Sequence, residues 1–591
     1  MERLEISDKY KWNLKDIYSS IEDYNKDKDI IQNLSDELLK YKGTITTNAD
    51  NLLSALKINE KIDTITSKLY VYANMNLHID TTDSFFQELT GNLNIIMTKI
   101  NEKLSFLITE LLKARYSVIE KYINENNGLK RFSYFLEQIF NEKKHVLGLK
   151  EEKILSRASN ILNVPDEVFS NLSDADMIFP DVSDSLGNKL SLTKGSYYKY
   201  ISSNDRTLRT NSFNTLYSKF REFNNTFANT MNSNVLITNF LYKTRKYKSA
   251  LNMHLSGNKI DEKIYHDLIK IVNNNLDKIY KYFSLRKKVL KYNELHMYDL
   301  SVNLIDEENK EYNYDTAKEL VLNALTGLGK DYVNDLNLAF DNNWIDVYET
   351  KGKRSGAYSW GCYPNHPYVL LNYQNRLDDV STLAHELGHA MHRYYSNNNQ
   401  DYYYSDNEIF VAEIASTVNE ILLKLYLLNN TNNKNEKLNI YNELMDDIKN
   451  TIYRQTMFAE FEINIHKLVD EDEVLSASRL NKLYYDLVKK YHGDNVIIDE
   501  DIKYEWSRIP HFYTPFYVYQ YATGLSIAID IAYKIYKGDS EMLKKYLEFL
   551  KSGSNDYPTN LVEKMGINIE TAVKDALNIF EGYIKEFESL Y

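Results

Sequence analysis

The sequence predicts a mainly helical protein with one small β-sheet. Its 591 residues include only 7 prolines and 19 glycines, so few residues interrupt helices. Apolar residues recur at helical spacing through most of the chain. The stretch 345–373 lacks that spacing and holds several glycines, two prolines and alternating aromatic residues. Because one hydrophobic core rarely serves a chain this long, we expect at least two domains or lobes.

Helices are expected wherever apolar residues return every three to four positions. The stretches that fit are 52–77, 86–123, 208–245, 260–293, 437–468 and 565–590. Extended structure is expected in two places. Residues 184–194 predict a small hairpin around Gly187 and Asn188. Residues 345–373 predict a small sheet just before the helix that carries the motif described below. No proline- or glycine-rich linker marks a domain boundary, and we place one near residue 200, between an N-terminal helical lobe (1–200) and the remainder (201–591).

Charge, cysteine content and hydropathy exclude several classes of protein. Lysine and arginine number 71 against 84 acidic residues, and the net charge of -13 argues against nucleic acid as the main partner. The single cysteine, Cys362, excludes an intrachain disulfide, and we interpret it as a small packed residue. No stretch approaches the roughly 20 apolar residues of a membrane span, and the N-terminus lacks a signal core. We therefore expect no membrane partner and a cytoplasmic location.

The segment His385-Glu386-Leu387-Gly388-His389 carries the clearest chemical signal. On a helix, residues four apart lie on the same face, so both imidazoles can reach one zinc ion. Glu386 follows the first histidine and can act as the general base for a metal-bound water. Asp378 and Asp379 supply helix-start chemistry, which places the motif about one turn into its helix.

A zinc site of this kind needs a third protein ligand, and three acids follow within reach: Glu408, Glu413 and Glu420. Glu413 is favoured, because its small and apolar neighbours predict a partly buried helix face, where a carboxylate needs a charge partner. Glu408 precedes that helix and is interpreted as a solvated charge. Glu420 either orients a histidine ligand or lies on the surface. His392 is turned aside from the pair, where it packs or forms a supporting hydrogen bond.

These motifs together resemble the oligoendopeptidase F branch of the thimet-oligopeptidase family. The resemblance covers most of the chain and rests on HELGHAMH, FVAEIAS, GAYSWG, LLNYQNRLDDVSTLAHE, WNLKDIY at 12–18, Arg209, RKY at 245–247, RQTMFAEFE at 454–462 and IPHFYTPFYVYQYATG at 509–524. It implies a two-lobed helical shell around a deep substrate channel, with one zinc ion on the floor. It also implies a zinc metallopeptidase domain over 201–591 that cuts short, unfolded peptides internally.

The resemblance also assigns residues outside the motif. Those expected to stabilise the transition state are His511, Tyr517 and Tyr521. The loop between the histidine and the first tyrosine is one residue longer than in the thimet type, which keeps Tyr513 and Tyr519 as alternatives. We expect the helix to begin near Phe516, with Tyr517 and Tyr521 on one face. By the same resemblance, the edge strand that lies along the substrate backbone comprises Gly356, Ala357, Tyr358, Ser359 and Gly361.

Two other functions stay open at this point. A dipeptidyl carboxypeptidase of the same family would need a cation for the substrate's terminal carboxylate, and Arg454 and Arg508 are candidates without a specific signal. A non-catalytic helical peptide-binding protein would hold no stoichiometric metal. Side-chain specificity and oligomeric state do not follow from the sequence.

Overall fold

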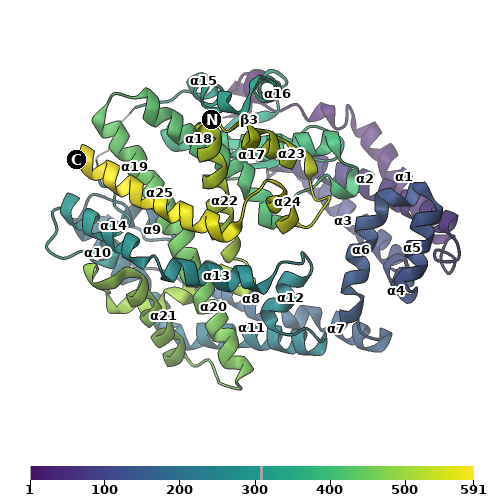
Figure 1. Ribbon diagram of the computed structural model, residues 1–591, viewed down its shortest axis with the longest axis horizontal. Helices are drawn as coiled ribbons and strands as arrows, with labels where there is room; N and C mark the ends of the chain where they lie inside the picture. The colour runs from purple at the N-terminus through teal and green to yellow at the C-terminus, as the bar shows by residue number, and fades with distance from the viewer. Residues whose placement is uncertain (1, 306–309) are drawn as a thin grey trace. The chain divides into compact units, whose positions relative to one another are not determined.

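The computed structural model describes residues 2–305 and 310–591 (Figure 1). The described chain divides into two compact units, each built from three separate segments. Unit 1 comprises Met1–Lys144, Asn309–Tyr426 and Ile531–Gly566, and unit 2 comprises His145–Glu308, Leu427–Asp530 and Ile567–Tyr591. The sequence predicts instead a single domain boundary near residue 200. That position lies inside unit 2, and the boundary stays a prediction.

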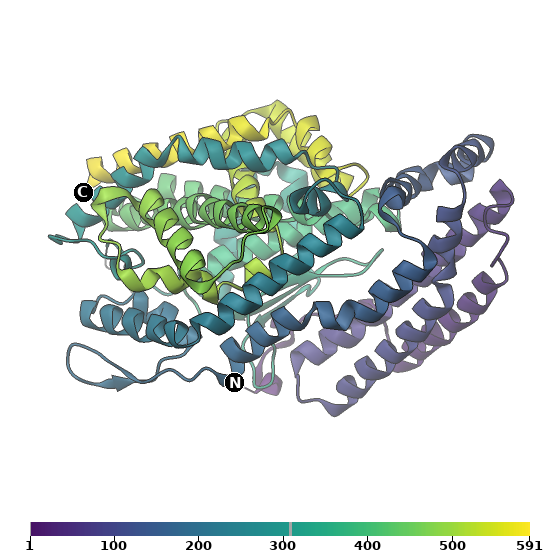
Figure 2. The ribbon, with the colours of Figure 1, turned by 90° about the horizontal axis from the view of Figure 1, so that it is seen from below.

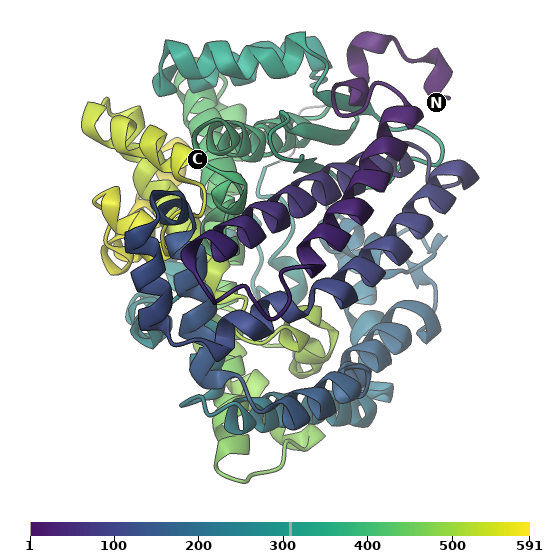
Figure 3. The ribbon, with the colours of Figure 1, turned by 90° about the vertical axis from the view of Figure 1, so that its right-hand side faces the viewer.

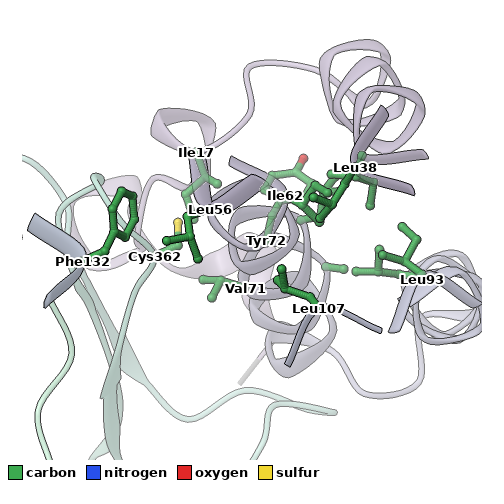
Figure 4. Packing of buried hydrophobic residues seen from close by; sticks show 14 of the residues in the cluster. Ile17, Leu38, Leu56, Ile62, Val71, Tyr72, Leu93, Leu107, Phe132 and Cys362 are labelled. Atoms are coloured by element: carbon green, nitrogen blue, oxygen red, sulfur yellow. The ribbon is translucent and has the colours of Figure 1, made fainter. Parts of the chain in front are cut away.

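Unit 1 begins with a layer of long helices. Its first three helices are α1 (Ile21–Leu39), α2 (Ala49–Ile79) and α3 (Ser84–Leu104), and they run side by side (Figure 3). The shorter helices that follow are α4 (Phe106–Lys113), α5 (Tyr116–Glu125) and α6 (Ser133–Asn141). Their apolar faces form one buried cluster, in which Cys362 lies with Leu56 and Phe132 (Figure 4). Burial raises the pKa of the Cys362 thiol to about 12, so the interpretation of a packed residue is confirmed.

The small sheet expected before the motif helix is confirmed. Its strands are β3 (Ile345–Tyr348), β4 (Tyr358–Trp360) and β5 (Tyr368–Tyr373), in the order β3-β5-β4. β3 pairs with β5 in parallel, and β4 pairs with β5 antiparallel. β4 is therefore at an edge of this sheet, with one side of its backbone outside the ladder.

The remaining helices of unit 1 include the motif helix and several that pack against it. They are α15 (Tyr314–Ala324), α16 (Lys330–Asp341), α17 (Leu377–Asn399), most of α18 (Ile409–Asn430), α23 (Ser540–Ser552) and α24 (Pro558–Lys564). α17 carries the motif and contacts β4, β5 and α23. The Asp379 carboxylate accepts the backbone N–H groups of Gln374 and Arg376, which begins the helix at Leu377. The motif thus lies about two turns into α17, one turn further than expected.

Unit 2 is a second helical body. Its elements are α7 (Leu149–Leu162), α8 (Val164–Ser170), β1 (Val182–Ser183), β2 (Lys189–Leu190), α9 (Lys194–Ile201), α10 (Arg206–Glu222), α11 (Asn224–Thr244), α12 (Ala250–Ser256), α13 (Glu262–Asn273), α14 (Leu276–Val289), α19 (Lys434–Ile448), α20 (Arg454–Asp470), α21 (Ala477–His492), most of α22 (Tyr519–Tyr536) and α25 (Ile569–Leu590). α25 lies alongside α13 and α14 (Figure 2). β1 and β2 form the expected hairpin, with Gly187 at a φ of 83°.

The predicted helical stretches are all helical, but several are broken. Within the stretch 86–123, α3 ends at Leu104 and the chain continues as α4 and α5. Within the stretch 208–245, the helix is interrupted at Phe223. Apolar spacing continues across these breaks, because the next helix presents its apolar face to the same core. The mainly helical fold with one small sheet beside the motif helix is therefore confirmed, whereas the channel stays a prediction.

Candidate active site

Three side chains of unit 1 converge on one point. The Nε2 atoms of His385 and His389 lie 3.1 Å apart, and each lies 3.4 Å from Oε2 of Glu413. Among the described residues these three form a group whose ligand atoms all lie within 4.8 Å of one another. Two imidazoles and one carboxylate, arranged with a side open to a pocket, form a donor set that fits a metal ion such as zinc.

A close helix crossing brings Glu413 to the histidines. A Cβ atom on Gly388 would lie 2.5 Å from the Cα atom of Ser416, so the glycine inside the motif lets α17 and α18 approach. Asn419 donates a 3.2 Å hydrogen bond to the carbonyl of Ala384 and holds the crossing. Glu413 itself is half exposed, more than expected, because its helix face opens onto a pocket while Val411 and Ile414 are buried.

The hydrogen bonds of the cluster orient its members. The Glu420 carboxylate accepts a hydrogen bond from Nδ1 of His385, which leaves Nε2 directed at the other donors. Burial alone would lower the pKa of His385, but this carboxylate outweighs it and raises that pKa to about 9. A hydrogen bond from His389 lowers the pKa of Glu413 to about 2. Of the two interpretations of Glu420, the structure shows the one in which it orients a histidine.

Glu386 has the surroundings of a general base. It is 7% exposed, and burial raises the pKa of its carboxyl group. The positive charges of His385 and His389, and to a smaller extent a backbone hydrogen bond from Ser359, oppose that rise. Among the described residues its Oε2 atom has no hydrogen-bond partner. The carboxylate borders a pocket of about 390 Å³. The residues that line this pocket are Ala357, Tyr358, Ser359, His385, Glu386, His389, Arg393, Asp406, Asn407, Ala412 and Glu413.

The predicted substrate strand overlaps β4, which contains Tyr358 and Ser359 of its five residues. Ala357, Tyr358 and Ser359 line the pocket, whereas Gly356 and Gly361 do not. Gly356 has a φ of 84°, and a Cβ atom on Gly361 would lie 2.9 Å from the Cα atom of Pro367. Both glycines therefore shape the ends of the strand rather than border the pocket.

The His511 segment belongs to unit 2, where its three predicted residues meet. Tyr521 Oη lies 3.3 Å from Nε2 of His511, and the Tyr517 ring lies 5.3 Å from that of Tyr521. Burial lowers the pKa of His511, so its imidazole is neutral near pH 7. The helix begins at Tyr519, not near Phe516, because Phe516 adopts a left-handed φ of 57°.

The two alternative tyrosines are packed in the interior of unit 2. Tyr513 stacks on Phe169, and its hydroxyl lies 2.6 Å from that of Thr230. Tyr519 is fully buried with its ring 5.2 Å from that of Tyr265. Both side chains are packed against other residues of the interior. This favours Tyr517 and Tyr521 as the tyrosines that contact the transition state.

Sequence reasoning did not find every residue at the pocket. Arg393, Asp406 and Asn407 line it, and Arg393 forms an ion pair with Asp406. Arg393 lies one turn beyond His389 on the same face of α17, a spacing that could have identified it. His392 is buried against Phe549 with both ring nitrogens unpartnered among the described residues, so it packs.

Comparisons with known proteins agree with this geometry. The model of peptidase family M3 matches residues 199–578, and that described as Oligopeptidase F matches residues 110–179. The chain belongs to peptidase family M3. Oligopeptidase PepF of Bacillus subtilis is 40% identical over 591 residues, 100% of this chain and 88% of that protein. The expected resemblance to the oligoendopeptidase F branch of this family is thereby confirmed.

Two solved peptidase structures share the fold of this chain. A crystal structure from Chlamydophila abortus is 35% identical, with a TM-score of 0.93 over 100% of both chains. That of oligoendopeptidase-F from Enterococcus faecium is 32% identical, with a TM-score of 0.75 over 96% of this chain and 99% of that one. No helix among the described residues of this M3 peptidase is both long and apolar enough to span a bilayer.

Proposed function

We propose that this chain is a zinc-dependent endopeptidase that cuts short, unfolded peptides. The observation that carries the proposal is the convergence of His385, His389 and Glu413 beside the buried Glu386 carboxylate, in a chain of peptidase family M3. The names of its relatives, oligopeptidase and oligoendopeptidase, support short peptides as substrates.

One zinc ion would be held by His385, His389 and Glu413. Two nitrogen donors and one oxygen donor are a set that catalytic zinc sites use, with a further position left for water or substrate. When bound, zinc would polarise the scissile carbonyl and lower the pKa of a coordinated water. Glu420 would keep His385 in the tautomer whose Nε2 is free to bind metal.

Glu386 would act on the attacking water. Its carboxylate accepts a hydrogen bond from the backbone of Ser359 and keeps Oε2 for another partner. That oxygen would take a proton from the water as it attacks the peptide carbonyl, and would then pass the proton to the leaving amine. The raised pKa of Glu386 suits a group that must both accept and donate a proton.

The remaining roles follow from the family resemblance. The backbone of β4 would pair with the peptide, which binds substrates with little regard to sequence. Neutral His511 would donate a hydrogen bond to the oxyanion, together with Tyr517 or Tyr521. The register of these tyrosines is supported by the interior packing of Tyr513 and Tyr519.

Cleavage of an internally quenched peptide of about ten residues, with blocked ends, tests the proposal. Internal cuts seen by mass spectrometry, abolished by a chelator and restored by zinc, are expected. The full-length Glu386→Gln protein is the matched control, because it keeps the metal donors and should cut at least about a hundredfold more slowly. Activity that survives complete metal removal contradicts the proposal. Comparing free and amidated C-termini separates an endopeptidase from a dipeptidyl carboxypeptidase, which requires the free carboxylate.

A further inference from the structure

Unit 2 contains a second cavity, of about 480 Å³, with a mixed aromatic and charged wall. The ionisable side chains of described residues along this wall, besides tyrosines and two histidines, are Lys449, Arg454, Glu505 and Arg508. Three cations thus face one carboxylate. In a protein with a net charge of -13, such a local excess of positive charge needs an explanation.

The excess arises from a repeated arrangement in which two cations share one carboxylate. Lys449 and Arg286 lie 2.5 and 3.8 Å from Asp446. Arg206 and Arg209 lie 2.7 and 2.8 Å from Asp299 in the same way.

The third group lies at the cavity itself. Arg454 and Arg508 lie 2.7 and 3.2 Å from the same oxygen of Glu505. Counting only these ion pairs of the described residues, each of the three groups holds two cations and one carboxylate. Of the three groups, those of Asp446 and Glu505 reach the cavity wall, through Lys449, Arg454 and Arg508.

Both oxygens of the Glu505 carboxylate already accept hydrogen bonds. One of its oxygens accepts from both arginines and from Tyr217, and the other accepts from Tyr484 at 2.6 Å. Its side chain is 4% exposed. A charged group that enters the cavity therefore meets the arginines rather than this carboxylate.

Arg454 keeps donors for a ligand, and Arg508 lies beside it at the cavity wall. A third of the Arg454 side-chain surface is exposed, and it lines the cavity. The Nε atom of Arg508 is buried without a partner among the described residues, and three tyrosine rings hold its guanidinium. Planar guanidinium groups bind carboxylates through paired N–H donors. A rigid arginine beside an accessible one is an arrangement that suits a carboxylate ligand.

His511 lines the same cavity. We propose that the cavity binds a carboxylate of the peptide substrate, with Arg454 as the principal partner. The proposal rests on the proposed function, since it takes His511 to lie beside the substrate. The carboxylate can come from an aspartate or glutamate side chain or from the peptide's C-terminus, because all present the same group.

Calorimetric binding to the zinc-loaded Glu386→Gln protein tests this without requiring turnover. The peptides are a neutral, end-blocked octapeptide, a series with one glutamate at successive positions, matched glutamine peptides, and the octapeptide with a free C-terminus. One carboxylate position should bind on the order of tenfold more tightly than its neutral match, as expected for a hydrogen bond to a charged group. A preferred internal position identifies a side chain, and preference for the free terminus identifies the C-terminus.

Arginine variants then test which residue causes the carboxylate preference. Adding Arg454→Gln should reduce it to less than twofold, and Arg454→Lys should restore part of it. Arg479→Gln is the matched control, because Arg479 is an exposed arginine of unit 2 that pairs with Glu473 and does not line the cavity.

Equal binding of every charged and neutral peptide pair overturns the proposal even if the Arg454 variants do not fold. A preference that survives Arg454→Gln overturns the role of Arg454. Absence of cleavage by wild-type protein would instead count against the proposed function and leave a measured carboxylate preference standing.

Discussion

Of the described acidic residues around the candidate metal site, only Glu386 is buried and also has a carboxylate oxygen without a hydrogen-bond partner. We predict that Glu386→Gln retains stoichiometric zinc, because no donor of the cluster changes. Turnover should fall by about 10²- to 10⁴-fold, the contribution typical of a general base. Metal analysis and peptide cleavage on the same preparation measure both. Loss of zinc together with activity would show that Glu386 supports the site instead of the proton transfer.

Glu420 acts through His385, which its carboxylate orients at Nδ1. Replacing it by alanine should weaken zinc binding by roughly 10- to 100-fold, the usual effect of losing a partner behind a metal ligand. Competition with a chromogenic chelator measures the affinity. Glu408→Ala is the control, because Glu408 lies just before α18 and outside the donor cluster. Equal affinities of the two variants would contradict an orienting role.

Sequence spacing by itself anticipated the part of the site whose geometry one helix determines, and the apolar neighbours of Glu413 pointed to the third donor. His385 and His389 share a face because they lie four apart on α17, and this follows from the helix repeat alone. The exposure of Glu413 did not follow, because it depends on how α17 and α18 cross. Asp406 was not anticipated, since it reaches the pocket from the loop before α18 and no periodicity marks it.

At the scale of elements, the turn before α22 shows how a distant side chain overrides local preference. The sequence predicts a helix from Phe516, yet this residue has a φ of 57°, which bulky side chains rarely adopt. Its backbone N–H donates a 2.7 Å hydrogen bond to Glu462, a fully buried residue of α20. Neither the turn nor the later start of α22 could be predicted locally, because Glu462 lies 54 residues away along the chain.

The same contact predicts a dependence of stability on pH. Burial raises the pKa of Glu462 from about 4.5 to about 8. Its contribution to folding is therefore complete below pH 4.5 and is lost as pH rises towards 8, where the folded protein must release a buried proton. Glu462→Gln keeps an acceptor for Phe516 but cannot ionise. We expect the urea midpoint of wild type to fall relative to this variant between pH 5 and 8.5.

The difference in urea midpoint between wild type and Glu462→Gln reports the ionisation of Glu462. His254 and His466 also contact Phe516, and burial lowers the pKa of each, but both are present in wild type and variant. Their titration therefore cancels in the comparison. Parallel midpoints across the whole pH range would show that Glu462 is not held protonated in the folded protein.

At the scale of the whole molecule, the chain passes repeatedly between its two units. Residues 1–144 join 309–426 and 531–566 in unit 1, so residues far apart in sequence share one core. Trp12 and Tyr368, for example, lie in the same buried cluster with ring centres 6.1 Å apart. Helix content could be predicted because it depends on local spacing, whereas this interleaving could not, since no linker marks the points where the chain changes units.

The division into units predicts which segments of the chain metal binding should stabilise. All three donors, on α17 and the first part of α18, belong to unit 1. A ligand that binds only the folded state stabilises the structure that holds it, and hydrogen exchange reports such stabilisation segment by segment. Adding zinc to chelated protein should slow amide exchange in α17 and residues 409–426. Exchange in α13 and α25 of unit 2 should change much less.

Two variants separate specific binding from a general effect of zinc. Glu386→Gln keeps the donors and should show the same slowing, whereas His389→Ala removes one donor and should lose it. Because His389 is one of the two donors that α17 supplies beside Glu413, its loss should weaken the metal's hold on both helices. Slowing of similar size in α13 and α25, or slowing that persists in His389→Ala, would place the principal metal site elsewhere in the chain.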